Sequence, residues 1–186
     1  NKKQIIITFD DGYKDIISLV LPILKKYNFK AICFIVTNYI GKYNLWDTNK
    51  NNYKKKEFLN KSDLVEWLNN GMMIGSHSHN HLDLSQLDSD ALEEEVSTSK
   101  KILEDTFSTS INDFCYPFGK INMNSYNMVK KNYNNAFTTN RSRYFYNKHD
   151  SLLIPRIDMG KKLTKFKMFL KLKTFYEDIK FSKYEI

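Results

Sequence analysis

The chain has 186 residues, of which 41% are hydrophobic, 27% charged and 15% aromatic. These values are typical of a globular domain and exclude a disordered or collagen-like chain. The net charge of +8 would suit a nucleic-acid partner, but eight lysines and only three acidic residues fall within residues 161–186. No zinc-finger, RNP-like or helix-turn-helix motif accompanies them. We therefore expect no nucleic-acid partner and interpret the excess as the solvated face of a basic tail.

Apolar periodicity predicts alternating strands and helices along the chain. Runs typical of strands lie at residues 5–9, 31–36, 72–76, 113–117, 135–139 and 152–157. Amphipathic stretches predict helices at residues 15–28, 63–70, 88–107, 123–132 and about 163–176, the second of them capped by Ser62. The Asn-, Lys- and Tyr-rich stretch 38–60 predicts a surface excursion. Because no linker interrupts this alternation, we expect a single α/β domain with a mostly parallel sheet, open or closed into a barrel.

The two cysteines, Cys33 and Cys115, each lie in an apolar run, so we expect free core thiols and no disulfide. No apolar run is long enough to cross a membrane, and no signal peptide is visible. We expect no integral membrane segment. The location is cytoplasmic if the chain is complete, and secreted or at the cell surface if an N-terminal signal has been removed. Nothing in the sequence indicates an oligomeric state.

Polar motifs lie at the ends of most predicted strands. "DDG" (10–12) follows the first strand, "HSHNH" (77–81) the third, "PFG" (117–119) the fourth and "TTN" (138–140) the fifth. In parallel α/β folds the chemistry gathers at the carboxyl ends of the strands. We therefore expect these motifs to form one site.

Three of the four histidines, His77, His79 and His81, alternate along the chain. In a strand all three imidazoles could converge, whereas in a helical turn or a curled loop only the i, i+4 pair would do so. Catalytic zinc sites offer three protein ligands and one open position, so two histidines with Asp10 or Asp11 would complete such a set. A different metallohydrolase site, built on the H-x-H of His77 and His79, is the alternative that the spacing leaves open.

Five segments together resemble one known family. "TFDDG" (8–12), "IGSHSHNHLDL" (74–84) and "FCYPFG" (114–119) look like the first three motifs of the polysaccharide deacetylases, the NodB-homology or carbohydrate esterase family 4 proteins. "AFTTN" (136–140) and "LIPRID" (153–158) are similar to the branch that deacetylates poly-N-acetylglucosamine. The segments occur in the family's order, so their combination is far more specific than any one of them.

The resemblance implies an α/β fold, a distorted and incomplete (β/α) barrel of NodB type in a single domain. It places the catalytic domain at residues 1–160, with the basic C-terminal helical tail, 161–186, packed on the same domain. The activity it implies is a metal-dependent hydrolase that removes acetyl groups from N-acetylated sugars of a polysaccharide or oligosaccharide. The expected partner is thus an N-acetylated glycan.

Carried over by position, the resemblance assigns roles to five residues. Asp10 becomes the general base, and Asp11, His77 and His81 become ligands of one divalent metal, zinc by preference, with cobalt or nickel as alternatives. The backbone N–H of Phe118 matches the family's oxyanion donor. The middle histidine of the cluster then stays outside the metal shell.

Two departures from the family pattern bear on catalysis. Many members have an arginine where this chain has Cys115, and Arg156 is the best replacement for holding Asp10 ionised. The family's later histidine, the general acid, has no counterpart. Either His149, in a polar loop, or Asp10 itself would then protonate the leaving amine. These gaps keep a catalytically impaired, carbohydrate-binding relative as a further alternative.

Substrate contacts are expected from residues in or near the later motifs. Aromatic rings could stack on sugar rings, although those next to the fourth strand could equally belong to the core. The candidate substrate-binding residues are Tyr116, Pro117, Phe118, Thr139 and Tyr144.

Overall fold

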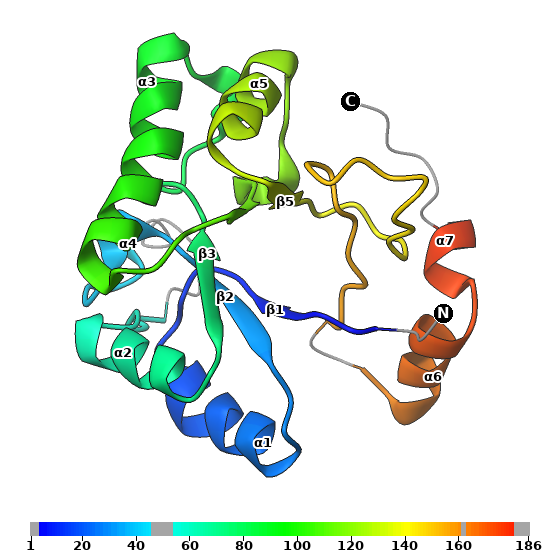
Figure 1. The fold of residues 1–186 in the computed structure, drawn as a ribbon. Coiled ribbons are helices and arrows are strands. Elements are labelled where there is room, and N and C mark those ends of the chain that lie inside the picture. The colour runs from blue at the N-terminus through cyan, green and yellow to red at the C-terminus, as the bar shows by residue number, and fades with distance from the viewer. Residues whose placement is uncertain (1–3, 46–53, 161–162, 181–186) are drawn as a thin grey trace.

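The computed structural model describes residues 4–45, 54–160 and 163–180. Its centre is a sheet of five parallel strands in sequential order: β1 (Ile7–Phe9), β2 (Ala31–Ile35), β3 (Met73–Ser76), β4 (Asp113–Cys115) and β5 (Asn135–Phe137). Parallel neighbours require a crossover between them, and Figure 1 shows the strands curling into a half-barrel with helices around it. The expected α/β fold, an incomplete barrel, is confirmed.

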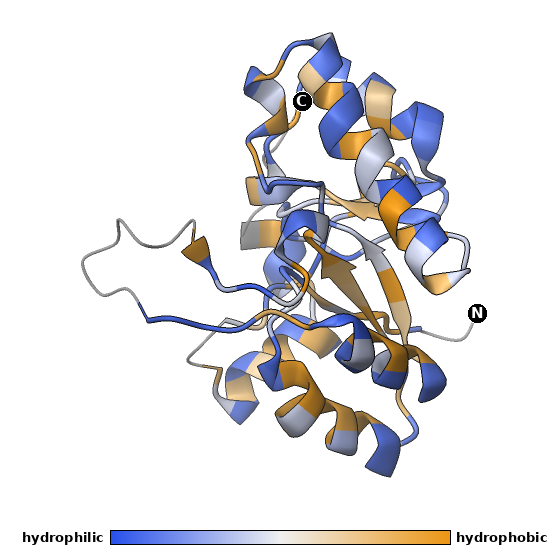
Figure 2. Ribbon diagram, turned by 90° about the vertical axis from the view of Figure 1, so that its left-hand side faces the viewer, coloured by the Kyte–Doolittle hydropathy of each residue, from blue (hydrophilic) through white to orange (hydrophobic). Residues whose placement is uncertain are grey.

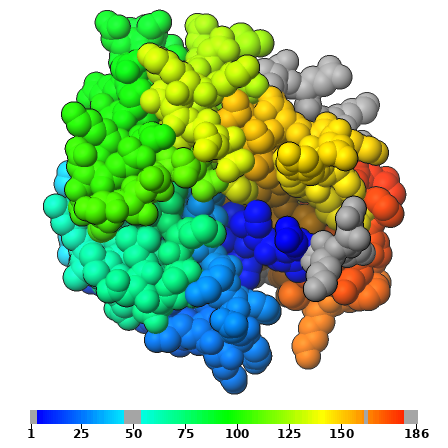
Figure 3. Space-filling view, viewed as in Figure 1, coloured from blue at the N-terminus to red at the C-terminus, as the bar shows by residue number. Residues whose placement is uncertain are grey.

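Helices occupy most of the connections. They are α1 (Leu21–Lys26), α2 (Lys61–Asn69), α3 (Ser89–Glu93), α4 (Ser99–Phe107), α5 (Met123–Asn132), α6 (Lys165–Lys173) and α7 (Tyr176–Lys180). Short π-helical turns, η1 (Ile16–Val20) and η5 (Glu94–Thr98), and 3₁₀ turns, η2 (Thr37–Tyr39), η4 (Leu84–Gln86) and η6 (Pro117–Gly119), complete them. Figures 1 and 3 show α6 and α7 on the side of the molecule away from α4, beyond β1.

The core fills the space between the sheet and these helices. Trp67 of α2 is fully buried, and its Nε1 donates to the Met73 carbonyl oxygen over 2.8 Å, which ties α2 to β3. Other side chains with no exposed surface include Phe34, Leu64, Leu84, Val96, Leu103, Phe114, Tyr116 and Val129. Figure 2 shows the apolar strands enclosed by helices with mixed polar and apolar surfaces. Cys33 and Cys115 are both buried and free, as expected.

The predicted strands are mostly confirmed, although several are shorter. Ile5 and Ile6 are 72% and 65% exposed and precede β1. The predicted sixth strand, residues 152–157, is wrong, because it makes only a single parallel bridge, between Ile154 and Phe137. Beyond that bridge the Thr138 carbonyl oxygen accepts from Arg156 Nε, and the Arg156 N–H donates to the Asn140 carbonyl oxygen instead, so the ladder does not continue.

Helix boundaries required larger corrections. Ser62 is not the cap of α2: Asn60 is, since its Oδ1 accepts from the Asp63 N–H over 2.9 Å while Asp63 Oδ2 accepts from the Asn60 N–H over 2.9 Å. The helix expected at 88–107 is present as α3, η5 and α4 in succession. The one expected at 163–176 is instead two helices, because Thr174 is extended (φ −122°, ψ 178°).

The stretch 38–60 is only partly a surface excursion. Residues 46–53 of it lie outside the described residues. Phe58 and Leu59 are 3% and 1% exposed, and the Phe58 ring stacks on Tyr13 with centroids 4.8 Å apart. This segment therefore contributes to the core next to the end of β1.

The C-terminal helices contact the loop before them. Arg143 Nε donates to Asp178 Oδ2 over 2.8 Å, and its guanidinium lies 3.8 Å from the Phe175 ring centroid. The division into a catalytic domain (1–160) and a tail (161–186) stays a prediction. Within the described ranges, no helix has the length and apolarity that a membrane crossing requires.

Neighbouring residues of α2 test this description of the core. Leu64 has no exposed surface, whereas Val65 is 46% exposed. We expect Leu64→Ala to lower the free energy of unfolding by about 2–5 kcal/mol, because it leaves a cavity. Val65→Ala should change it by less than about 0.5 kcal/mol. Urea denaturation followed by circular dichroism measures both, and equal losses would contradict the packing described.

Candidate metal centre and active site

Polar residues gather where the strands end, as the sequence predicts. Asp10 and Asp11 follow β1, His77 follows β3, and Cys115 ends β4. Two clusters in the described part of the chain bring three ligand-type atoms within 4.8 Å of one another: Asp11 with His77 and His81, and Asp10 with His77 and Cys115. The first cluster contains the three metal ligands that the family resemblance implies.

The Asp11 carboxylate faces both imidazoles of this first cluster. Its Oδ1 lies 3.4 Å from His77 Nε2 and 3.5 Å from His81 Nε2. Tetrahedral coordination with bonds of about 2.1 Å places ligand atoms roughly 3.4 Å apart. The donor set, two imidazole nitrogens and one carboxylate oxygen, therefore fits a tetrahedral divalent cation that keeps one position open.

The orientation of His77 supports this fit. Its Nδ1 donates to the Cys115 carbonyl oxygen over 2.7 Å, which leaves Nε2 facing Asp11. Burial lowers the pKa of His77, but the neighbouring Cys115, Asp11 and Asp10 outweigh it and raise that pKa well above its usual value. Positive charge is thus favoured between these groups, as a divalent cation would supply.

The backbone is strained at the same place. Six non-glycine residues among those described have a positive φ, and four of them line this site. They are Asp11 (69°), Ser78 (67°), His81 (61°) and Phe118 (59°). Such angles cost free energy and persist where surrounding contacts hold them. At His81 one such contact is its N–H, which donates to Ser78 Oγ over 3.0 Å.

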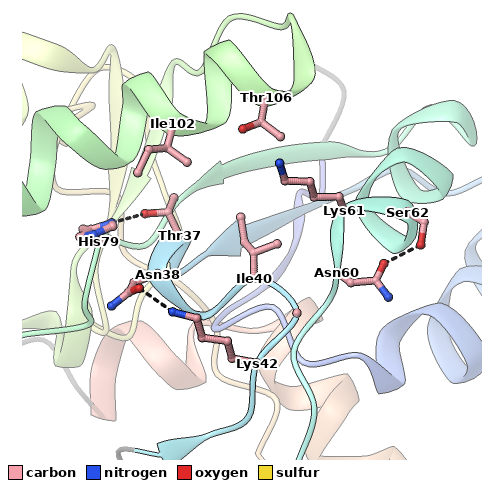
Figure 4. A pocket seen from close by; sticks show the side chains of 11 residues that line it. Thr37, Asn38, Ile40, Lys42, Asn60, Lys61, Ser62, His79, Ile102 and Thr106 are labelled. Carbon is pink, nitrogen blue, oxygen red and sulfur yellow. Dashed lines mark hydrogen bonds between the residues drawn. The ribbon is translucent and has the colours of Figure 1, made fainter.

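His79 lies apart from the metal ligands. Its Nδ1 is 2.8 Å from Thr37 Oγ1, and it belongs to neither cluster of potential ligands. Its ring lines a pocket of about 590 Å³, shown in Figure 4, whose other lining residues include Lys42, Lys61 and Ile102 but none of the proposed metal ligands. The position of His79 disfavours a metal site built on the H-x-H pair.

Asp10 is held by Arg156 in a two-pronged ion pair. Nη1 donates to Oδ1 over 2.7 Å and Nη2 donates to Oδ2 over 2.8 Å. Burial raises the pKa of Asp10, but the hydrogen bonds and charge of Arg156, together with the charge of His77, outweigh it and lower that pKa below its usual value. Asp10 is therefore ionised, and Arg156 occupies its oxygens while Asp11 faces the histidines.

Arg156 is itself oriented by three further contacts. Its Nε donates to the Thr138 carbonyl oxygen over 2.9 Å, and Nη1 also donates to Thr8 Oγ1 over 3.2 Å. Nη2 lies 3.4 Å from the buried Cys115 Sγ. Cys115 thus stands beside the guanidinium that the sequence predicts as the substitute for an arginine at position 115.

The remaining predicted residues divide between surface and core. Phe118 is 56% exposed, and its ring lies 4.6 Å from that of His81. Tyr116 has no exposed surface and packs edge-on against Phe114 at 5.3 Å. This burial contradicts a stacking role for the Tyr116 ring, because a sugar could not reach it. Pro117 is also buried.

Thr139 and Tyr144 are accessible. Thr139 is exposed and packs directly over Gly119, where any Cβ would collide with it. Tyr144 is 36% exposed and lies 5.8 Å from the His149 ring. His149 Nδ1 accepts from the Phe145 N–H over 3.1 Å, so the contacts described for His149 lie within its own loop. Its role as general acid stays a prediction.

One residue beside the site was not predicted from the sequence. Glu95 is 1% exposed, and its carboxylate accepts hydrogen bonds from the N–H groups of His79 and Asn80. The available signal was its place on the helix face shared with Leu92 and Val96, where an acidic residue requires a buried partner.

Comparisons with known proteins agree with this geometry. The family model described as polysaccharide deacetylase matches residues 1–136. Among curated proteins, the chain is 31% identical over 131 residues to the putative polysaccharide deacetylase YxkH of Bacillus subtilis, and 27% identical over 139 residues to poly-beta-1,6-N-acetyl-D-glucosamine N-deacetylase of Staphylococcus aureus. These matches cover 70% of this chain but only 42% and 45% of the two relatives.

A solved structure extends the likeness to the fold. The Streptococcus pyogenes deacetylase PplD, in complex with acetate, superposes with a TM-score of 0.77 at 26% identity, over 93% of this chain and 72% of PplD. Fold, motif order and family model thus point the same way. The chain belongs to the polysaccharide deacetylase family.

Proposed function

We propose that the chain is a metal-dependent hydrolase that removes acetyl groups from N-acetylated sugars of a glycan. One observation carries the proposal: the Asp10 carboxylate, paired with Arg156, lies directly beside the cluster of Asp11, His77 and His81. A base kept ionised next to three convergent metal-ligand atoms is the arrangement that metal-assisted amide hydrolysis requires. Since the chain spans less than half of its curated relatives, this activity is inferred from its own residues.

Asp11, His77 and His81 would hold the metal. Two imidazoles and a carboxylate suit zinc and would accept cobalt or nickel. When bound there, the cation supplies Lewis acidity to the acyl oxygen and to the attacking water.

The chain's own residues would do the rest of the chemistry. Asp10 takes a proton from the water while the water oxygen bonds to the acetyl carbon. The N–H of Phe118, whose ring lies beside that of His81, would donate to the oxyanion that develops. The carbon–nitrogen bond then breaks, and the leaving amine takes a proton, which Asp10 now carries and can return. This route needs no contribution from His149.

The substrate is proposed to be a glycan with N-acetylated sugars, such as the polymer named for the Staphylococcus aureus relative. Exposed rings at Phe118, Tyr144 and Phe145 are available for stacking on sugar faces. Thr139, packed over Gly119 of the same edge, offers a hydroxyl to the sugar. Acetate release from N-acetylglucosamine oligomers, compared with an O-acetylated sugar, tests this choice.

A carbohydrate-binding protein without catalysis is the second candidate. The observation that favours it is the placement of His149, which contacts Tyr144 and Phe145 of its own loop. Binding of an N-acetylated oligomer without acetate release, in zinc-loaded protein, would select this alternative.

The histidine variants test the metal centre. We expect His77→Ala and His81→Ala each to weaken zinc binding more than about 100-fold, since even residues that only support a ligand contribute 10–100-fold. His79→Ala should weaken it less than about 10-fold, because its side chain bonds Thr37 and belongs to neither cluster of potential ligands. Competition with a chromophoric chelator measures all three. An equal loss in His79→Ala would favour the H-x-H site instead.

Asp10→Asn tests the general base. The amide cannot take a proton, so kcat for acetate release should fall about 10²–10⁴-fold. Zinc affinity should be largely kept, because Asp11 and not Asp10 faces both imidazoles. Steady-state kinetics and chelator competition on the same preparation separate the two. Full turnover in Asp10→Asn would exclude this mechanism.

Arg156→Lys tests the two-pronged contact. Lysine keeps the charge but cannot donate to both Asp10 oxygens in one plane. We expect kcat to fall about 10-fold or more, with KM changing less, since the guanidinium contacts Asp10, the proposed base, and is itself only partly exposed. The control is Arg141→Lys, whose ion pair with Asp158 is exposed. Equal kinetics in Arg156→Lys and the native protein would contradict this role.

A further inference from the structure

Residues 77–81, which carry three of the histidines, form a loop after β3 that we call the histidine loop. It presents successive backbone N–H groups to one buried carboxylate. Glu95 Oε2 accepts from the N–H of His79 over 3.1 Å and from that of Asn80 over 2.9 Å. Its Oε1 accepts from Asn80 Nδ2 over 2.7 Å. Consecutive N–H groups next to a left-handed residue, here Ser78 at φ 67°, form an anion-binding concavity. Glu95, only 1% exposed, supplies the anion.

The helical segment that carries Glu95 also contacts the chain just before the histidine loop, at the end of β3. Ser99 Oγ lies 2.7 Å from Ser76 Oγ, at the end of β3, and donates to the Val96 carbonyl oxygen over 2.9 Å. The Tyr133 hydroxyl donates to that same carbonyl over 3.0 Å. Glu95, Val96 and the turn η5 around them are thus fixed against the sheet, so the carboxylate is a rigid anchor.

The opposite side of the loop is held by η2. The Asn38 N–H donates to the His79 carbonyl oxygen over 3.0 Å, and Asn38 Nδ2 donates to Asn80 Oδ1 over 2.6 Å. Thr37 Oγ1 bonds the His79 ring, as Figure 4 shows. Residues 79 and 80 are therefore held from two sides, and of the two proposed ligands His81 follows them directly while His77 precedes them with Ser78 between.

We propose that Glu95 is a positioning residue of the metal centre, which fixes the imidazoles of His77 and His81 through the backbone between them. The inference rests on the metal centre proposed above. Its physical reason is that His81 has a strained φ of 61°, which persists only while the loop is held. If the carboxylate is removed, two backbone N–H groups lose their acceptor and the loop can relax.

Glu95→Gln, with Glu94→Gln as its matched control, tests the proposal. Glutamine keeps the size of the side chain but turns an NH₂ group toward N–H donors, whereas Glu94 is exposed on the same turn. We expect zinc binding about 10–100-fold weaker in Glu95→Gln, the usual cost of losing a group that orients a ligand, and no change in Glu94→Gln. Chelator competition gives the dissociation constants, and thermal unfolding of the metal-free proteins shows that both fold.

A lowered melting temperature of Glu95→Gln with unchanged zinc affinity would mean a purely structural role and would overturn the proposal. If Glu95→Gln does not fold, Asn80→Ala removes the side-chain donor to Glu95 together with the acceptor of Asn38 Nδ2 on the opposite side of the loop. It should weaken zinc binding by a few-fold, and unchanged affinity there would again overturn the proposal. A native protein that binds no zinc would contradict the metal centre itself, and with it this inference.

Discussion

The Arg156 guanidinium joins the two edges of an open sheet. β1 and β5 lie at opposite ends of the strand order, and no ladder connects them. Arg156 bonds Thr8 of β1 and the carbonyl of Thr138, which directly follows β5, while its two terminal nitrogens hold Asp10. The hydrogen bonds of the Arg156 guanidinium thus connect β1 and β5, which do not pair as strands because the barrel is incomplete. The position and ionisation of Asp10 both depend on it.

This contact separates the roles of two adjacent carboxylates. Like charges on neighbouring residues repel, and a shared cation or proton is the usual remedy. Here Arg156 engages both oxygens of Asp10, while the left-handed φ of Asp11 turns its side chain to His77 and His81. One carboxylate is therefore available as a base and the other as a ligand, although the chain places them side by side.

The histidine loop shows how the fold holds strained backbone at the site. Its two positive-φ residues, Ser78 and His81, lie on either side of the part that Glu95 and η2 grip. The same grip directs the His79 ring to Thr37, away from Asp11. Because the loop is held through its backbone N–H and C=O groups, only two of its three imidazoles reach the Asp11 carboxylate.

Local patterns in the sequence were sufficient to predict the strands β1 to β5 and the helices at 88–107 and 123–132. Burial of one face repeats apolar residues every two positions in a strand and every three to four in a helix. The polar motifs at the strand ends were also visible in the sequence. They were insufficient where several equivalent residues compete. Asn60 and Ser62 are both good caps, and residues 152–157, whose apolar pattern looked complete, form a bridge with β5 only at Ile154. The choice depended on which backbone groups were left unpaired.

The resemblance of the motifs to the polysaccharide deacetylases brought forward Asp11, His77 and His81, together with Asp10 and Arg156, whereas spacing alone left the choice of ligands open. It could not select Glu95 from three consecutive glutamates, nor show that the ring of Tyr116 is in the core. Those outcomes depend on contacts between segments far apart in the chain, such as η5 against the histidine loop. The sequence by itself determined which chemical groups are present and near which strand ends; the tertiary structure decided which of them face one another, since burial and hydrogen-bond satisfaction are set only when the segments pack.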